Sequence, residues 1–257
     1  MNNNIFFILS HQDDEFGLFN VIEQATQKKQ NVFVIYLTSG HRTKKENKKY
    51  KLQKRDKESL NTLLKLGVIK KNIIFLGKKL NIPVYELHKN LNTTYQNINE
   101  LLKKYRGKQI LYTHAWEGGN EDHDSCHIIV KKILIQKIKI INCFEFSQYH
   151  NYKTKILPFK VHNFIFDKRK IYKTKINFFN KIKYIIFLFN YTSQLYIWIP
   201  IYPFIISKIL MNNYGNLKMI NKNTIIRKPH KGKLLYEKLR ANKYEYYEKY
   251  FINFLSN

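Results

Sequence analysis

Five consecutive residues near the start of the chain, His11-Gln12-Asp13-Asp14-Glu15, combine groups that can bind a metal ion and move protons. Acidic residues in the first turn of a helix commonly serve only as caps or as partners of the helix dipole. The imidazole of His11 favours a second interpretation, because the Asp14 carboxylate three residues later can converge with it on one divalent ion. Asp13 would face the same ion without binding it, in the position needed for a general base that activates water.

A second cluster of histidines and carboxylates runs from His114 to His127. Within it, His123 and His127 are four residues apart and share one face of a helix. Three interpretations are open. His123 alone completes a site with the first cluster, or His123 and His127 chelate together as in His-Glu-x-x-His metalloproteases, or His123-Asp124 is the dyad of an HD-type phosphohydrolase. The metalloprotease pattern requires a Glu where Asp124 stands, and HD-type folds are helical.

Strand and helix patterns alternate through the first 146 residues and must position both clusters. Apolar runs predict strands at 5–9, 32–37, 73–76, 109–113 and 140–146, and the patterns between them predict helices at 17–29, 55–66, 92–105 and 124–137. This alternation predicts an α/β fold: a Rossmann-like doubly wound, mostly parallel sheet of order 3-2-1-4-5 with helices on both faces. The clusters follow the first and fourth strands, which are neighbours at the topological switch point where ligands bind. The first of the three interpretations is therefore favoured.

The remaining residues, 147–257, differ in composition and periodicity. They hold 21 basic residues and only four acidic ones. We therefore divide the chain into a catalytic core, 1–146, and a basic C-terminal extension, 147–257, which is expected to pack on the core and complete the substrate pocket. The apolar run Leu195–Ile206 contains two prolines and cannot comfortably span a bilayer. It is interpreted as buried core or pocket wall, with contact to a membrane surface as the alternative.

The formal net charge is +28, from 46 Lys+Arg against 18 Asp+Glu. Only six of these basic residues are Arg, which proteins prefer for bidentate contacts to phosphate. Because the chain is also rich in Asn, Ile, Tyr and Phe, whose codons are A/T-rich like those of Lys, we attribute the charge mainly to composition and expect no specific nucleic-acid partner. The alternative is an anionic partner such as a nucleotide sugar, a glycolipid or a membrane. Two cysteines and a short N-terminal apolar run predict a cytoplasmic protein, with peripheral contact to the inner face of the membrane as an option.

Both clusters resemble signatures of the LmbE-like/PIG-L family of zinc-dependent N-deacetylases. Residues 10–15 correspond to the family's first signature, Ala-His-Pro-Asp-Asp-Glu, and residues 118–124 to its second, Gly-Gly-His-Pro-Asp-His-Asp. The resemblance implies one zinc ion per chain, held by His11, Asp14 and His123. It also implies that Asp13 is the general base that activates water and returns a proton to the leaving amine.

The chain departs from the family pattern at residue 120. Family members have a His there that stabilises the oxyanion and is paired with the Asp at position 122. Asn120 cannot supply the charge of an imidazolium, although its amide can donate one hydrogen bond. We therefore expect three catalytic residues, Asp13, Asn120 and Asp122, and three residues that contact the substrate, Arg55, Trp116 and His127.

These implications predict removal of the acetyl group from an N-acetylated amino sugar or sugar conjugate, nucleotide-linked or lipid-linked, in glycan or glycoconjugate synthesis. The competing hypothesis is an inactive relative that uses its basic extension to bind anionic membrane or nucleic acid. The complete set His11, Asp13, Asp14 and His123 favours the enzyme, because a protein that only binds has no physical need for it.

Overall fold

The computed structural model describes residues 3–41, 49–136, 140–154, 158–223 and 226–256. Its strands are β1 (Asn4–Leu9), β2 (Asn31–Tyr36), β3 (Ile73–Phe75), β4 (Gln109–His114), β5 (Ile140–Phe146), β6 (Tyr149–His150), β7 (Lys160–Val161), β8 (Ile171–Lys175) and β9 (Tyr214–Met219). Seven of them form a central sheet of order β3-β2-β1-β4-β5-β9-β8, and β6 pairs with β7 in a small second sheet. Strands β1 to β5 are parallel, whereas β9 is antiparallel to both β5 and β8.

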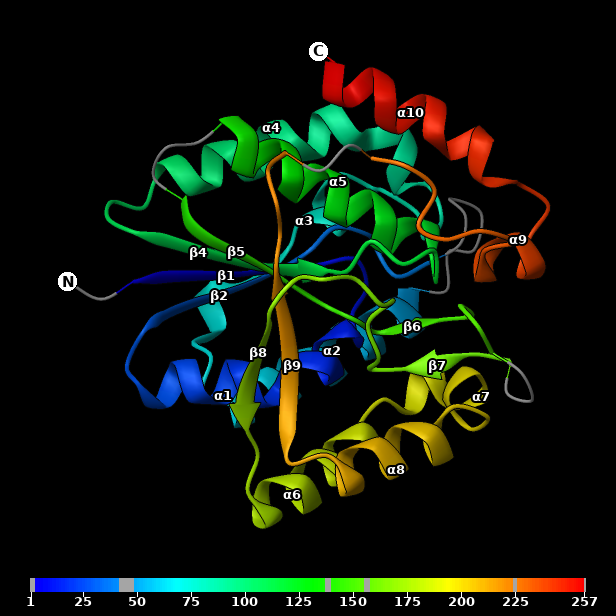
Figure 1. Ribbon diagram of the computed structural model, residues 1–257. Helices are drawn as coiled ribbons and strands as arrows, with labels where there is room; N and C mark the ends of the chain where they lie inside the picture. Colours follow the sequence, from blue (N-terminus) through cyan, green and yellow to red (C-terminus); the bar gives the residue numbers. More distant parts are fainter. Residues whose placement is uncertain (1–2, 42–48, 137–139, 155–157, 224–225, 257) are drawn as a thin grey trace.

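Helices cover both faces of the central sheet (Figure 1). The α-helices are α1 (Phe19–Gln27), α2 (Lys49–Lys65), α3 (Leu76–Lys79), α4 (Leu91–Lys103), α5 (Glu121–Gln136), α6 (Phe178–Leu188), α7 (Leu195–Trp198), α8 (Tyr202–Met211), α9 (Leu235–Leu239) and α10 (Tyr244–Ser256). Short 3-10 helices are η1 (Asp14–Leu18), η2 (Lys70–Asn72), η3 (Leu87–Asn90) and η4 (Thr192–Gln194). Helices α3, α4, α5 and α10 pack on one face, and α1, α2, α6, α7 and α8 on the other.

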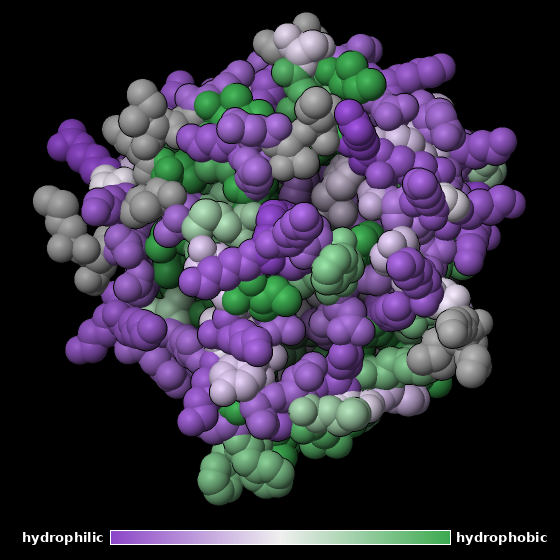
Figure 2. Space-filling model, viewed as in Figure 1, coloured by the Kyte–Doolittle hydropathy of each residue, from purple (hydrophilic) through white to green (hydrophobic). Residues whose placement is uncertain are grey.

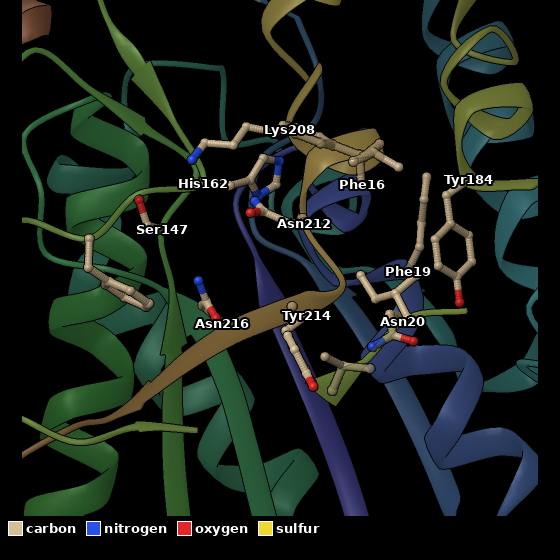
Figure 3. A pocket seen from close by; sticks show the side chains of 16 residues that line it. Phe16, Phe19, Asn20, Ser147, His162, Tyr184, Lys208, Asn212, Tyr214 and Asn216 are labelled. Carbon is tan, nitrogen blue, oxygen red and sulfur yellow. The ribbon is translucent and has the colours of Figure 1, made fainter. Parts of the chain in front are cut away.

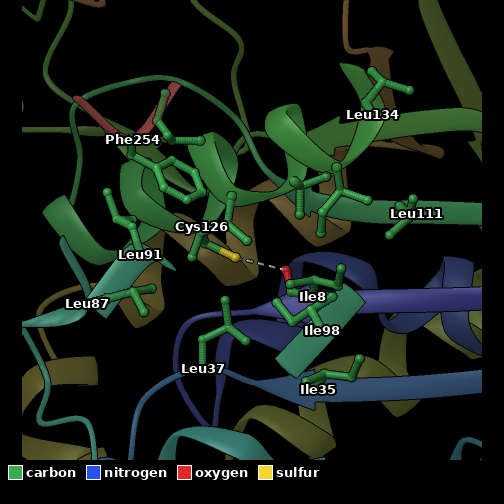
Figure 4. Packing of buried hydrophobic residues seen from close by; sticks show 14 of the residues in the cluster. Ile8, Ile35, Leu37, Leu87, Leu91, Ile98, Leu111, Cys126, Leu134 and Phe254 are labelled. Carbon is green, nitrogen blue, oxygen red and sulfur yellow. Dashed lines mark hydrogen bonds between the residues drawn. The ribbon is translucent and has the colours of Figure 1, made fainter. Parts of the chain in front are cut away.

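Alternation of side chains along the buried strands explains the two helical layers. In β1, Phe6 and Ile8 join one hydrophobic cluster, whereas Phe7 and Leu9 join the other. Successive side chains of a strand point to opposite faces, so a strand that is apolar throughout needs cover on both. On the α5 side, the Cys126 thiol donates a hydrogen bond to the carbonyl oxygen of Ile8 at 3.2 Å (Figure 4).

The expected fold class is confirmed, with strand order 3-2-1-4-5 and helices on both faces. The predicted helices at 55–66 and 92–105 correspond to α2 and α4. The helix predicted at 124–137 corresponds to α5, which begins at Glu121, and Lys137 lies outside the described residues. The helix predicted at 17–29 is α1, which is shorter because η1 precedes it.

The sheet is larger than the sequence pattern predicts. The extension adds β9 and β8 to its edge, where Lys218 of β9 pairs with Glu145 of β5. Pattern analysis missed both strands, because β8 exposes alternate residues and β9 carries Gly215 and Asn216 among its few apolar positions. The central sheet therefore continues across the division that we placed at residue 146.

No single helix in the described ranges is long and apolar enough to cross a membrane. The segments Thr192–Trp198 and Tyr202–Met211 together pass the same test of length and composition, but a bend of 93° separates them. Within the run Leu195–Ile206, Trp198 is buried and Ile199 is exposed. The run thus has one side that packs on the core and one that faces outward.

Candidate active site

The carboxyl ends of β1 and β4 bring the two sequence clusters together. The strands are parallel neighbours, with Phe7 opposite Tyr112. His11 and Asp14 follow β1, and His123 lies in the first turn of α5, which follows β4. Ligand atoms of these three residues all lie within 4.8 Å of one another, and all three side chains are buried. The topology has therefore assembled one group from residues more than a hundred positions apart.

The donor set of this group fits a divalent metal ion. Asp14 offers one oxygen to each histidine: Oδ1 lies 3.2 Å from His123 Nε2, and Oδ2 lies 3.4 Å from His11 Nδ1. Neither ring nitrogen of His123 has a hydrogen-bond partner among the described residues. A buried polar atom without a partner is costly, and coordination to a metal ion would satisfy it. Two imidazoles and one carboxylate are the protein ligands of many catalytic zinc sites.

The groups around the set hold its members in place. Asp122 Oδ2 lies 3.0 Å from His11 Nε2, and Gln148 Nε2 donates to Asp14 Oδ1 at 3.0 Å. A carboxylate on the second ring nitrogen fixes the orientation of a metal-binding histidine. Asp122 is held in turn by the backbone N–H groups of Tyr85 and Leu87. The first nitrogen of His11, Nδ1, is thereby directed towards Asp14.

This arrangement differs from the pairing that the family resemblance implied. The Asp122 carboxylate contacts His11 and two backbone amides, whereas Asn120 contacts Asp122 only through the backbone: Asn120 Oδ1 accepts the Asp122 N–H at 2.9 Å. The physical reason is local, because Asn120 immediately precedes α5 and its side chain caps the unpaired N–H groups of the first turn. Asp122 thus contacts the residue 120 side chain through its backbone N–H, and the catalytic roles of Asn120 and Asp122 stay predictions.

Charges within the group favour a cation. Burial alone would lower the pKa of His11, but the carboxylates of Asp14 and Asp122 raise it to about 10. Burial would likewise raise the pKa of Asp14, yet the imidazoles of His123 and His114 hold it well below its ordinary value. A divalent ion would supply the positive charge that these buried carboxylates stabilise.

Asp13 is held beside the group in a strained conformation. Its φ of 148° lies in a region that non-glycine residues rarely adopt, and such strain typically costs about 1–3 kcal/mol. Arg55 donates to Asp13 Oδ1 at 2.9 Å, and the Trp198 indole donates to Oδ2 at 3.1 Å. The Asp13 N–H donates to Glu15 Oε2 at 3.0 Å. Burial raises the pKa of Asp13 above its ordinary value, opposed by the charge of Arg55, and a raised pKa suits a general base.

One cavity is lined by Asp13 and by two members of the metal-ligand group, His11 and Asp14. Its walls come from the core and from the extension: His11, Asp13, Asp14, Phe16, Arg55, Val84, Tyr85, Asn120, Gln148, Tyr149, Val161, Gln194, Ile197, Trp198, Ile201 and Ile205. Two neutral hydrogen-bonding groups meet at its edge, where Asn120 Nδ2 lies 3.4 Å from the Tyr149 hydroxyl. Burial raises the pKa of Tyr149 well above its ordinary value, so its hydroxyl keeps its proton and can donate.

A neighbouring cavity shares Phe16 with this one but contains no member of the metal-ligand group (Figure 3). Phe16 packs edge-on against His162 on one side and against Trp198 on the other, with ring centroids 5.2 and 4.8 Å apart. Burial lowers the pKa of His162 to about 4, so its ring is neutral near pH 7. This second cavity is partly apolar, its lining includes the charged residue Lys208, and none of the described residues that line it is an Asp or Glu.

The three residues predicted to contact substrate line two different cavities. Arg55 lines the cavity, but its guanidinium already contacts Asp13 and the carbonyl oxygen of Gly40. Trp116 and His127 line another cavity, which does not include the metal-ligand group. His127 Nδ1 lies 2.9 Å from the carbonyl oxygen of His114 and is outside the group. Trp116 and His127 thus line a different cavity from Asp13, and their contact with substrate stays a prediction.

Histidine 114 is a close neighbour of the group. Its Nε2 lies 3.1 Å from Asp14 Oδ2, and its ring stacks on that of His123 with centroids 3.9 Å apart. The backbone N–H of Ser10 donates to the same Nε2 at 3.2 Å. His114 is therefore a packing and electrostatic partner of the two ligands on which it lies.

Sequence reasoning missed Gln148, Tyr149 and Trp198 as members of the site. Gln148 and Tyr149 follow β5, the third strand whose carboxyl end borders the cavity, so the rule that placed the two clusters could have found them. Trp198 lies in an apolar run without periodic pattern, and its contact with Asp13 joins segments far apart in sequence. No local pattern in the sequence indicates that contact.

Fold and site together define an LmbE-like α/β protein with a His-Asp-His group at the switch point of the sheet. The family model described as PIG-L, GlcNAc-PI de-N-acetylase, matches residues 6–134. Since this match covers half of the chain, the protein belongs to the PIG-L family. No curated protein matches the chain.

Solved structures share the fold at low sequence identity. A deacetylase of teicoplanin biosynthesis, described in complex with BOG, has a TM-score of 0.62 at 13% identity, over 84% of this chain and 97% of that one. The zinc-inhibited form of the teicoplanin deacetylase Orf2 has a TM-score of 0.63 at 12% identity, over 84% of this chain and 97% of that one. The N,N'-diacetylchitobiose deacetylase from Pyrococcus horikoshii has a TM-score of 0.61 at 14% identity, over 85% of this chain and 84% of that one.

Proposed function

We propose that this protein is a zinc-dependent N-deacetylase that removes the acetyl group from an N-acetylated amino sugar or sugar conjugate. The observation that carries the proposal is the buried group His11, Asp14 and His123, two members of which, His11 and Asp14, line the same cavity as Asp13. Membership of a de-N-acetylase family supports it, and so do structural neighbours described as teicoplanin and N,N'-diacetylchitobiose deacetylases. The amino sugar is proposed to be free or carried on a nucleotide or lipid, as an intermediate of glycan or glycoconjugate synthesis.

In this proposal one zinc ion is held by His11 Nδ1, the Asp14 carboxylate and a ring nitrogen of His123. Zinc in such a site supplies a Lewis acid that polarises the acetyl carbonyl and lowers the pKa of water. Asp122 occupies the second nitrogen of His11 and Gln148 donates to Asp14, so both side chains would be held in place to bind the ion.

Asp13 is proposed as the general base. Its carboxylate accepts the proton of the attacking water and later returns a proton to the departing amine. Arg55 and Trp198 each bind one of its oxygens, so the carboxylate cannot rotate away from the cavity. Such positioning allows a proton acceptor to act without first being oriented, which lowers the entropic part of the barrier.

Asn120 and Tyr149 are proposed to stabilise the oxyanion of the tetrahedral intermediate. Both line the cavity, and each can donate one hydrogen bond from a neutral group. Removing one such donor typically lowers kcat by a factor of about 10²–10³. With two neutral donors, the site does not need the imidazolium that other family members place at residue 120.

A panel of N-acetylated compounds tests the proposal directly. The purified protein with zinc is incubated with N-acetylglucosamine, N,N'-diacetylchitobiose and UDP-N-acetylglucosamine, and free acetate and free amine are measured. Equal amounts of both products should form from at least one compound. Asp13→Asn should retain zinc and lose activity, whereas Asp167→Asn, a carboxylate outside the cavity that pairs with Lys218, should remain active. The proposal is wrong if Asp13→Asn turns over substrate as fast as the unchanged protein.

A further inference from the structure

Exposed hydrophobic side chains are concentrated on three helices of the extension. The large exposed ones on and beside α6, α7 and α8 are Phe178, Phe179, Ile182, Ile186, Phe189, Leu195, Tyr196, Ile199, Leu210 and Met211, which we call the α6–α8 face. The most exposed are Phe179 at 81% and Met211 at 78%. More than half of the large hydrophobic side chains exposed on the described part of the chain lie between residues 178 and 214.

The face is contiguous in the fold. Helices α6 and α8 pack against each other, and along α6 the residues Phe178, Ile182 and Ile186 recur every four positions on one side. Figure 2 shows hydrophobic side chains gathered along the lower edge of the molecule, where Figure 1 places α6 and α8. Soluble proteins rarely expose large contiguous apolar patches, and those that do commonly use them for binding.

Exposed lysines lie on the strand that leads into the face, in a stretch of sequence without acidic residues. From Lys168 to Tyr236 the chain contains no Asp or Glu. Lys173 and Lys175 are exposed on β8, the strand that leads into α6, and Lys173 Nζ lies 5.6 Å from the centre of the Tyr214 ring. Aromatic and aliphatic side chains ringed by lysines are the features of surfaces that enter an anionic lipid interface.

The opposite side of the same helices borders the candidate active site. Ile197 and Ile201 line the cavity, and Trp198 between them binds Asp13. Ile199, one residue further along, is 62% exposed on the outer side. A surface held against the α6–α8 face would therefore lie next to one wall of the cavity.

We propose that the α6–α8 face docks on a bilayer that contains anionic phospholipid, with its aromatic side chains in the interface and the flanking lysines against the lipid phosphates. The bilayer is favoured over a protein partner because the face combines projecting Phe and Ile side chains with the exposed lysines of β8, Lys173 and Lys175, and a fluid lipid interface accepts such a surface without matching its shape. The proposal does not depend on the deacetylase activity.

Vesicle binding tests the docking. The purified protein is centrifuged with vesicles of phosphatidylcholine alone or with 30 mol% phosphatidylglycerol (about one lipid in three, to provide a surface potential). The protein should sediment with the anionic vesicles, and added salt should weaken binding through screening of the lysines. The double variant Phe178→Ser and Phe179→Ser should weaken binding by at least about tenfold. Ile69→Ser, a matched control at 59% exposure outside the face, should bind like the unchanged protein.

A single fluorescent label locates the contact. Cys126 and Cys143 are buried, so a cysteine introduced by Phe179→Cys is the accessible site for an environment-sensitive dye, with Ile69→Cys as the control. The dye at residue 179 should shift to the blue with anionic vesicles, and the dye at residue 69 should not. No vesicle binding at low salt, or equal binding by the serine variant, overturns the proposal. Concentration-dependent dimers lost in the serine variant, without vesicle binding, would assign the face to self-association and overturn it as well.

Discussion

The indole nitrogen of Trp198 donates a hydrogen bond of 3.1 Å to Asp13 Oδ2, across 185 positions of sequence. Asp13 comes directly after the first strand, and Trp198 comes from the basic extension. The proposed base is thus held by a residue outside the family-matched region, 6–134. This contact means that the extension contributes to the site itself as well as to the fold.

Loss of this hydrogen bond should slow catalysis without removing the metal. Trp198→Phe keeps an aromatic ring against Phe16 but has no N–H for Asp13. We expect kcat on the best substrate of the panel to fall by about tenfold, the worth of one hydrogen bond to a charged group, with zinc content unchanged. Tyr196→Phe, an exposed aromatic residue nearby, is the control and should be neutral. Equal kcat for Trp198→Phe and the unchanged protein would show that Arg55 alone positions Asp13.

Each of the three proposed ligands should be needed for zinc. His11→Ala, Asp14→Ala and His123→Ala each remove one donor from a group whose ligand atoms lie within 4.8 Å. We expect about one zinc per purified chain and much less in each variant, measured by mass spectrometry of the metal. His127→Gln is the matched control, since this buried histidine lies outside the group. Loss of zinc in His127→Gln but not in Asp14→Ala would support the metalloprotease-like interpretation instead.

Asp122 should tune metal affinity through His11. Asp122→Asn keeps the size of the side chain but removes the negative charge from His11 Nε2. Comparable second partners of metal-binding histidines change affinity by about 10–100-fold, so zinc should bind more weakly by that factor in competition with a chelator. Glu86→Gln provides a control carboxylate that lies between Tyr85 and Leu87 in sequence and is more exposed than Asp122. Unchanged affinity in Asp122→Asn would restrict Asp122 to holding the backbone of Tyr85 and Leu87.

The two functions of Asn120 can be separated by substitution. Asn120→Asp keeps the side-chain oxygen that accepts the Asp122 N–H and loses the amide that can donate. Turnover should fall by about 10²–10³, while the melting temperature stays near that of the unchanged protein. Asn120→His is not expected to raise the rate, because the Asp122 carboxylate contacts His11 and is not available to charge a ring at residue 120. A faster Asn120→His variant would show that Asp122 can change partners.

Acid should destabilise the fold through buried histidines, of which His88 is a clean example. Its two nitrogens have no hydrogen-bond partner among the described residues, and the rings of Tyr247 and Tyr250 pack against it. Burial lowers the pKa of His88 from 6.5 to about 4. His88 is therefore protonated below about pH 6.5 in the unfolded chain but only below about pH 4 in the folded chain. Between these two pH values the free energy of unfolding falls as the pH falls, by at most about 3 kcal/mol.

His88→Leu should remove this part of the acid sensitivity. Denaturant unfolding at pH 7 and pH 4.5 measures it, and the difference between the two free energies should be smaller in the variant. The site is apolar, so the substitution should not destabilise the protein at pH 7 by more than about 1–2 kcal/mol. Equal differences in variant and unchanged protein would assign the acid sensitivity to other histidines, such as His127, whose pKa burial lowers to about 3.

The sequence by itself determined the parallel core and the proximity of His11, Asp14 and His123. Apolar strands such as Val32–Tyr36 alternate with amphipathic helices, and this pattern permits few topologies. Once strands 1 and 4 are neighbours, residues that directly follow them must meet, so His11, Asp14 and His123 could be predicted as one group. Both inferences depend on local patterns and on rules of chain connection, which the sequence carries directly.

Tertiary structure alone decided the partners of those residues. Side-chain directions at the ends of helices and strands decide these partners, because a shift of one residue there changes every contact. They decide which carboxylate contacts His11, which donors hold Asp13 and which cavity His127 lines. Strands β9 and β8 extend the sheet as an antiparallel pair, with β8 at its edge. Antiparallel strands can leave one face exposed, so their hydrophobic pattern is weak. Contacts between distant segments have no local pattern, so the role of Trp198 could be found only in the folded chain.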